Sequence, residues 1–169
     1  MIEPVQVEGG GYDFYLPSSS VLSVETRFFQ STPEKTLTIP STAARVITVG
    51  AYDTYTEAYA DFSGRGRNMP PASVNIKPDF VAPGVNIKTL SPGNVPVAVS
   101  GTSFATPFAS GSAALLMEWG IVRENDPFLY GEKVKAYLRR GARTLRSESV
   151  YPNNRVGWGA LCLAGSLPD

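Results

Sequence analysis

The feature that most limits how this chain can fold is a long apolar segment, residues 105–119, in which Glu118 is the one charged residue. A helix that is apolar on every side is stable only when other parts of a protein cover it. Pro107 is compatible with the first helical turn, where its missing N–H is not needed, and Gly120 marks the expected end. The segment therefore predicts a helix buried on nearly all sides.

A serine lies directly at the start of this helix. Ser103 belongs to the sequence Ser100-Gly-Thr-Ser-Phe-Ala-Thr-Pro107, between a glycine-containing turn and the helical segment. Free N–H groups and the positive end of the helix dipole favour negative charge at such a place, which suits a nucleophile whose attack creates an oxyanion. A serine needs a base to remove its proton, and the chain contains no histidine. The usual base is therefore absent from these residues.

The pattern around the helix is α/β. Three short apolar runs, residues 45–51, 79–83 and 95–100, are bounded by glycine or proline and are typical of strands, the first of a buried parallel strand. A second helix is predicted over residues 132–143, with apolar residues at helical spacing. We expect its basic residues to form a solvated face: Lys133, Lys135, Arg139 and Arg140.

The first 36 residues differ from the rest. They alternate aromatic, aliphatic and polar positions in residues 12–16 and 21–29, and glycine, proline and serine clusters separate these stretches. Such a pattern favours two short strands and turns over helix. An extended surface loop is the alternative.

Composition excludes several classes of protein. Acidic and basic residues balance at 15 each, which gives no reason to expect a nucleic-acid or membrane partner. No stretch approaches 18 consecutive apolar residues, the signature of a membrane span. Cys162, the single cysteine, excludes a disulfide within the chain. No cluster of residues has the spacing of a metal site.

The sequence from Gly101 to Pro107 resembles the nucleophile motif of the subtilisin-like serine proteases. Three further segments resemble that family in the same order: residues 39–51, 59–66 and 77–87. The resemblance extends from Leu37 to the end of the chain. It implies a three-layer α/β fold with a mostly parallel sheet, of which residues 37–169 form the C-terminal part. Residues 1–36 resemble the tail of a β-rich, jelly-roll-like domain inserted in the clostridial branch of the family.

The resemblance also implies roles for individual residues. Ser103 is expected to be the catalytic nucleophile and an oxyanion donor, with Gly101 and Thr102 in the nucleophile loop. Ser100 and Phe104 are candidates for the substrate cleft. The family's catalytic aspartate and histidine and its oxyanion asparagine precede the serine, so we expect them on polypeptide outside these residues. For subtilisin itself, loss of the histidine or serine costs about 2 × 10⁶ in kcat, and the chain alone is expected to be inactive.

Several alternatives remain open at this point. Ser103 could be a helix N-cap in an inactive relative, because serine is a favoured cap. The chain could belong to a pseudoprotease or be a structural, self-associating piece that forms a homo-oligomer. A Ser–Lys dyad is disfavoured because Lys77 and Lys88 match non-catalytic segments. Asp53, Asp61 and Asp79 match loop or capping positions.

The partners and surroundings follow from the resemblance alone. We expect a protein or peptide substrate, and the missing N-terminal half of the protease as a second partner. Subtilisin-like proteases often bind structural calcium, which is therefore possible in the parent protein, but no residue here can be assigned to calcium or to any cofactor. An extracellular or spore-associated location fits the family.

Overall fold

The computed structural model describes residues 13–17, 21–70, 73 and 75–168. The chain divides into two units between Thr32 and Pro33, close to the boundary at residue 36 expected from composition. In the first unit, the described residues form turns and bends and contain no strand. The prediction of two short strands is therefore wrong for these residues, since a strand forms only where a second strand can pair with it; Tyr12 lies outside the described residues. That this unit is the tail of an inserted domain stays a prediction.

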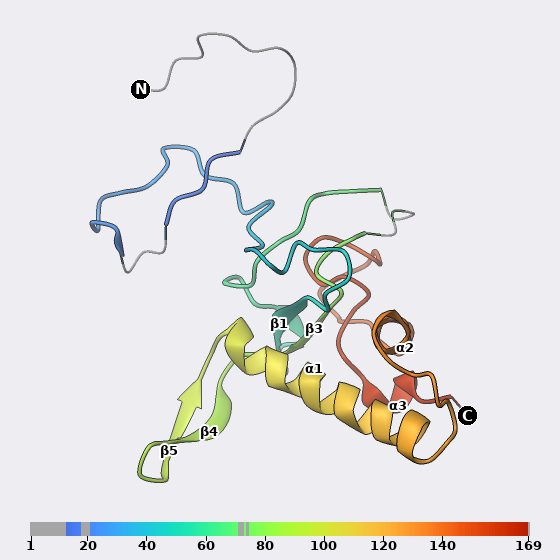
Figure 1. Cartoon of the computed structure of the whole chain (residues 1–169). Coiled ribbons are helices and arrows are strands. Elements are labelled where there is room, and N and C mark those ends of the chain that lie inside the picture. Colours follow the sequence, from blue (N-terminus) through green and yellow to red (C-terminus); the bar gives the residue numbers. More distant parts are fainter. Residues whose placement is uncertain (1–12, 18–20, 71–72, 74, 169) are drawn as a thin grey trace. The chain divides into compact units, whose positions relative to one another are not determined.

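A small mixed sheet lies at the centre of the second unit (Figure 1). Its strands β1 (Val49–Asp53), β2 (Ala58–Tyr59) and β3 (Phe80–Pro83) have the order β2-β1-β3. β1 and β3 are parallel, with Val49 beside Phe80, while β1 and β2 are antiparallel. Both parallel strands are apolar and largely buried, as expected for strands covered on two faces. The parallel pairing predicted from the apolar runs is confirmed.

A separate antiparallel hairpin precedes the serine. It consists of β4 (Ile87–Ser91) and β5 (Val95–Val99), paired from Ile87 beside Val99 to Ser91 beside Val95. The hairpin is mostly exposed. Its second strand leads directly into the turn before the long helix, so the predicted strand at residues 95–100 is present with almost the predicted bounds.

The long helix α1 (Thr102–Met117) packs on β1 and β3 (Figure 1). Small residues allow this approach, because Ala105 lies in one cluster with alanines of both strands, Ala51 and Ala82. The helix then continues as one wider, π-helical turn, η2 (Glu118–Val122). Gly120 is therefore not the end of the helix. It lies inside η2, where an added Cβ would come within 2.5 Å of the Leu129 side chain.

Only one face of α1 is covered. Ala105, Ala109 and Leu116 are its buried residues, whereas Phe108 and Leu115 remain 43% and 55% exposed. The expectation of burial on nearly all sides is wrong for the described residues, because the sheet covers a single face. The uncovered side carries apolar side chains seven residues apart, which lie on the same side of a helix, and we call it the outer face of α1: Phe108 and Leu115.

The second helix, α2 (Glu132–Arg140), is three residues shorter than predicted, and short α3 (Leu163–Ser166) follows near the C-terminus. The basic face of α2 is not entirely solvated. Lys135 is 3% exposed, and both Lys135 and Arg139 reach the buried carboxylate of Asp79. No helix in the part of the chain that the structure describes is long and apolar enough to cross a membrane.

Candidate active site

Ser103 is the second residue of α1 and is exposed. The helix cap is Gly101, and no side chain forms a cap hydrogen bond there, so the interpretation of Ser103 as an N-cap is wrong. Among the described residues, no hydrogen bond holds the Ser103 hydroxyl. The first N–H groups of a helix have no partner within the helix. The hydroxyl therefore lies free at a helix end that favours negative charge.

The turn before Ser103 is fixed by the ends of the buried strands. Gly101 has a φ of +154°, a backbone conformation that residues other than glycine rarely adopt. Its N–H donates to the Gly84 carbonyl at 2.8 Å, and the Gly84 N–H donates to the Tyr52 carbonyl at 3.1 Å. A Cβ on Gly84 would come within 2.6 Å of Ala51 Cβ. The glycine after β3 thus lets the nucleophile turn lie directly on β1.

The other predicted site residues take different places. The hydroxyl oxygen of Ser100 accepts the Asn86 N–H at 3.0 Å, so Ser100 fastens the turn to the base of the hairpin. The Phe104 N–H donates to the Gly101 carbonyl at 3.1 Å within the first turn. Thr102 and Ser103 both line a pocket that neither Ser100 nor Phe104 lines. The structure therefore brings Thr102 and Ser103 together at one cavity and places Ser100 as an anchor.

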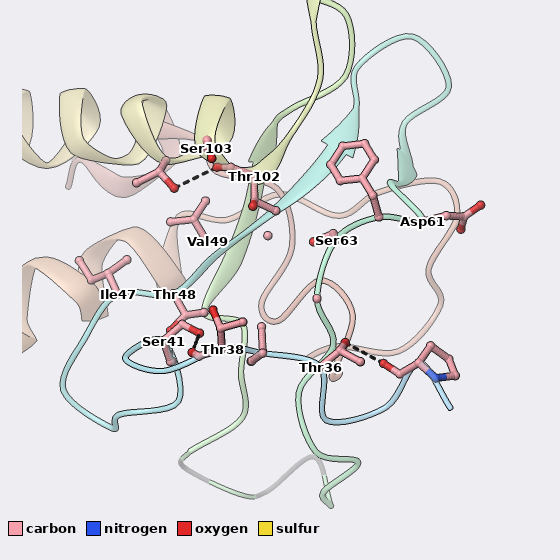
Figure 2. Close-up of a pocket in the computed structure, with 16 residues that line it drawn as sticks. Thr36, Thr38, Ser41, Ile47, Thr48, Val49, Asp61, Ser63, Thr102 and Ser103 are labelled. Atoms are coloured by element: carbon pink, nitrogen blue, oxygen red, sulfur yellow. Dashed lines mark hydrogen bonds between the residues drawn. The ribbon is translucent and has the colours of Figure 1, made fainter. Parts of the chain in front are cut away.

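The pocket beside Ser103 has a volume of about 580 Å³ (Figure 2). Three chain segments form it together with the start of α1: residues 33–41, the beginning of β1 with the residues before it, and the loop 61–64. Half of its sixteen lining residues carry a hydroxyl group: Thr36, Thr38, Ser41, Thr48, Ser63, Thr102, Ser103 and Thr106. Sequence reasoning missed all of these except Thr102 and Ser103; the frequency of serine and threonine in residues 36–48 was the available signal.

No base lies beside Ser103 in the described part of the chain. Asp61 lines the pocket, but its carboxylate points away from the cavity (Figure 2). Asp53 accepts the Tyr55 N–H at 2.9 Å in a turn. Burial lowers the pKa of Lys77, yet its ammonium donates to Asp79 at 2.9 Å. Asp79 is fully buried. The described residues also contain no cluster of acidic, cysteine or histidine side chains that could hold a metal ion.

Comparison with known proteins gives a consistent result. The family described as "Subtilase family" matches residues 23–159. Serine protease AprX of Bacillus subtilis is 34% identical over 154 residues, which covers 79% of this chain and 32% of the relative. Minor extracellular protease Vpr of the same organism is 36% identical over 119 residues, covering 66% of this chain and 14% of the relative.

A solved structure agrees with these relatives. The CspB protease of Clostridium perfringens is 48% identical and superimposes with a TM-score of 0.76, covering 83% of this chain and 29% of that protein. The present chain thus spans about a third of the length of AprX and of CspB, and less of Vpr.

Proposed function

The chain belongs to the subtilase family, and we propose that it is the part of a serine endopeptidase that carries the nucleophile, Ser103. The observation that carries this proposal is an exposed hydroxyl, free of hydrogen bonds among the described residues, at the start of α1 and at the edge of a pocket. A turn fixed at Gly101 holds it there. The family relationship supports peptide-bond hydrolysis, since both AprX and Vpr are proteases by name.

The catalytic base is proposed to come from another stretch of polypeptide, because these 169 residues contain no histidine. In the complete site, Ser103 Oγ attacks the substrate carbonyl while the histidine takes its proton. The Ser103 N–H stabilises the oxyanion of the tetrahedral intermediate. The proton then passes to the leaving amine, and water hydrolyses the acyl-enzyme by the reverse steps.

The same missing stretch is proposed to cover the outer face of α1. Exposed apolar patches of this kind mark surfaces that pack against another protein segment. Covering Phe108 and Leu115 would complete the burial that the composition of α1 requires. We therefore expect the N-terminal part of the catalytic domain to bind this chain. Action outside the cell is proposed from the name of the relative Vpr.

A fluorophosphonate probe tests the proposal, since it labels a serine only when a base activates that serine. The chain is labelled alone and after co-expression with the matching N-terminal part of the CspB protease, with complex formation checked by size-exclusion chromatography. We expect labelling only in the complex and none after Ser103→Ala. Ser110→Ala is the matched control, because Ser110 is an exposed serine on the same helix that donates to the Thr106 carbonyl. This variant should still be labelled at Ser103 in the complex. Equal labelling of the isolated chain would contradict the missing-base proposal. A complex that hydrolyses peptides after Ser103→Ala would contradict the nucleophile.

A second candidate is a non-catalytic, self-associating chain, favoured by the exposed outer face of α1. Light scattering distinguishes the two. Dimers that persist when the N-terminal part is supplied, with no probe labelling, support the second candidate. Displacement of dimers by the N-terminal part supports the enzyme.

A further inference from the structure

We propose that the pocket beside Ser103 selects a substrate side chain that is uncharged and donates hydrogen bonds, with an aliphatic stem: the carboxamide side chain of glutamine at a residue flanking the cleaved bond. This inference rests on the proposed function, because it concerns the substrate of that site. It is carried by the orientation of the hydroxyl groups in the pocket and by the lack of a charge directed into it.

The hydrogens of several lining hydroxyls are already used. Ser41 donates to the Thr38 carbonyl, Thr48 donates to the Ser41 carbonyl at 2.6 Å, and Thr106 donates to the Thr102 carbonyl at 3.0 Å. A hydroxyl has one hydrogen and two lone pairs. These three side chains therefore offer mainly acceptor oxygens to a molecule in the pocket, and an N–H group of the ligand can satisfy them.

Among the residues that the structure describes, no charged side chain points into the pocket where a substrate ion could pair with it. Asp61 is the one charged residue in its lining, and the carboxylate points away from the cavity (Figure 2). An ammonium group would lose water there without gaining a counter-ion, which is costly. A carboxylate could accept hydrogen bonds from free hydroxyls such as Thr38 and Thr102, but it has no N–H group to offer the acceptor oxygens of the three side chains whose hydrogens are used. A neutral carboxamide loses less on leaving water and brings the two N–H groups that the acceptors lack.

The remaining lining accounts for the stem of the side chain and for the amide oxygen. Leu37, Ile47 and Val49 supply apolar contact surface. Thr38 and Thr102 also line the pocket, and their side chains form no hydrogen bond among the residues described, so each hydroxyl can donate to the amide oxygen. Mixed apolar and polar linings of this kind fix the orientation of a ligand. The combination fits glutamine better than leucine, which would leave the oxygens unpaired.

Peptide binding to the whole 169-residue chain tests this inference without requiring catalysis. The probes are acetylated, amidated pentapeptides, alanine at every position except the centre, which is Gln, Glu, Lys or Leu. Nuclear magnetic resonance titration gives each Kd and shows whether the amides of Thr38, Thr48 and Ser103 shift. Removing the partners of a buried polar group costs about tenfold in affinity. We therefore expect the Gln peptide to bind at least tenfold more tightly than the Glu and Lys peptides, with shifts at these amides.

Two variants isolate the acceptor oxygens. Thr48→Val and Thr106→Val remove one acceptor oxygen each at nearly constant side-chain shape. Each should lower the affinity for the Gln peptide toward that for the Leu peptide. The matched control Thr89→Val, on the exposed face of β4, should leave the preference unchanged. Thr106 is exposed on α1, so this variant remains informative even if Thr48→Val does not fold.

Three results would overturn the inference: Glu or Lys peptides that bind as tightly as Gln, no peptide that shifts the pocket amides, or a Gln preference that survives Thr106→Val. None of them bears on the probe labelling of Ser103. Conversely, a Gln preference with no labelling in the complex would leave the pocket assignment standing and remove the proposed function. The failures of the two proposals are therefore distinguishable.

Discussion

Replacement of Asp79 by asparagine should destabilise this protein more than any change on its surface. Asp79 is fully buried and accepts hydrogen bonds from the Thr48 N–H at 2.6 Å, from Lys77 at 2.9 Å and from Arg139 Nε at 2.8 Å. Lys135 lies 3.7 Å from the same carboxylate. Three cations therefore share one buried anion. Asparagine keeps the size of the side chain but removes the charge and replaces one acceptor oxygen with an N–H donor, which would face the N–H groups that surround Asp79.

The size of this loss of stability follows from the buried cations that Asp79→Asn leaves without a counter-ion. Lys77 and Lys135 are 7% and 3% exposed, so neither can return to water without rearrangement. Removing one partner of a buried ion pair costs about 3–5 kcal/mol, because the remaining charge is uncompensated. A whole domain is stable by only about 5–15 kcal/mol. Asp79→Asn is thus expected to remove a large part of the stability, and a second variant is needed in case it does not fold.

Lys135→Met is that second variant. It removes one of the surplus cations and keeps the apolar stem, so the free energy of unfolding should stay within about 1 kcal/mol of the wild-type value or rise. In Asp79→Asn/Lys135→Met the loss should be smaller than in Asp79→Asn alone, since fewer unpaired charges remain. The exposed carboxylate of Asp61 supplies a control, and Asp61→Asn should be nearly neutral.

Urea denaturation followed by tryptophan fluorescence measures these differences. Arg139 stacks over Trp158 at 4.1 Å from the ring centre, so this tryptophan reports directly on the charged cluster. Equal slopes m among the variants would show that stability, and not the denatured state, has changed. If Lys135→Met lowers the free energy of unfolding as much as Asp79→Asn does, the cluster has no surplus of positive charge and the reasoning is refuted.

Three further predictions concern the nucleophile turn and the second helix. Gly101→Ala should cost about 1–3 kcal/mol in urea denaturation, because alanine disfavours the φ of +154°; no loss of stability would contradict the strained turn. Ser100→Ala removes the acceptor for the Asn86 N–H and should cost about 1 kcal/mol in the same assay. The hydrogen bond from Lys133 lowers the pKa of Asp126 below its ordinary value of 3.8. The associated stabilisation is complete above that value and is lost as the pH falls through the lowered pKa of the folded protein. Thermal denaturation between pH 2 and 5 should therefore show a flatter pH dependence for Asp126→Asn than for the wild type.

Much of the fold around Ser103 could be predicted from the sequence. Strands β3 and β5 and the start of α1 lie within a few residues of their predicted places, because glycine and proline bound short apolar runs there. The family was identified correctly from four ordered motifs. The role of Ser103 as nucleophile stays a prediction that the turn geometry supports.

The features that sequence reasoning missed depend on contacts between distant residues. Arg139 was assigned to a solvated face, yet its partner Asp79 lies 60 positions earlier in the chain. The burial of α1 was overestimated, because composition shows which side chains a helix can bury and not which other segments cover them. The sequence could not predict that the hydroxyls of Ser41 and Thr48 offer acceptor oxygens to the pocket, because this depends on the carbonyl groups to which they donate.

The hairpin β4–β5 is closed at its base and open at its tip. The Gly101–Gly84 hydrogen bond and the Asn86–Ser100 hydrogen bond close it, whereas an added Cβ on Gly93 in the turn would meet nothing within 4 Å. Extra residues in a surface loop cost little free energy once the loop ends are fixed. The tip at residues 92–94 is therefore a suitable insertion point for a tag or fluorophore. The two hydrogen bonds at the base would still hold Ser103 in its position.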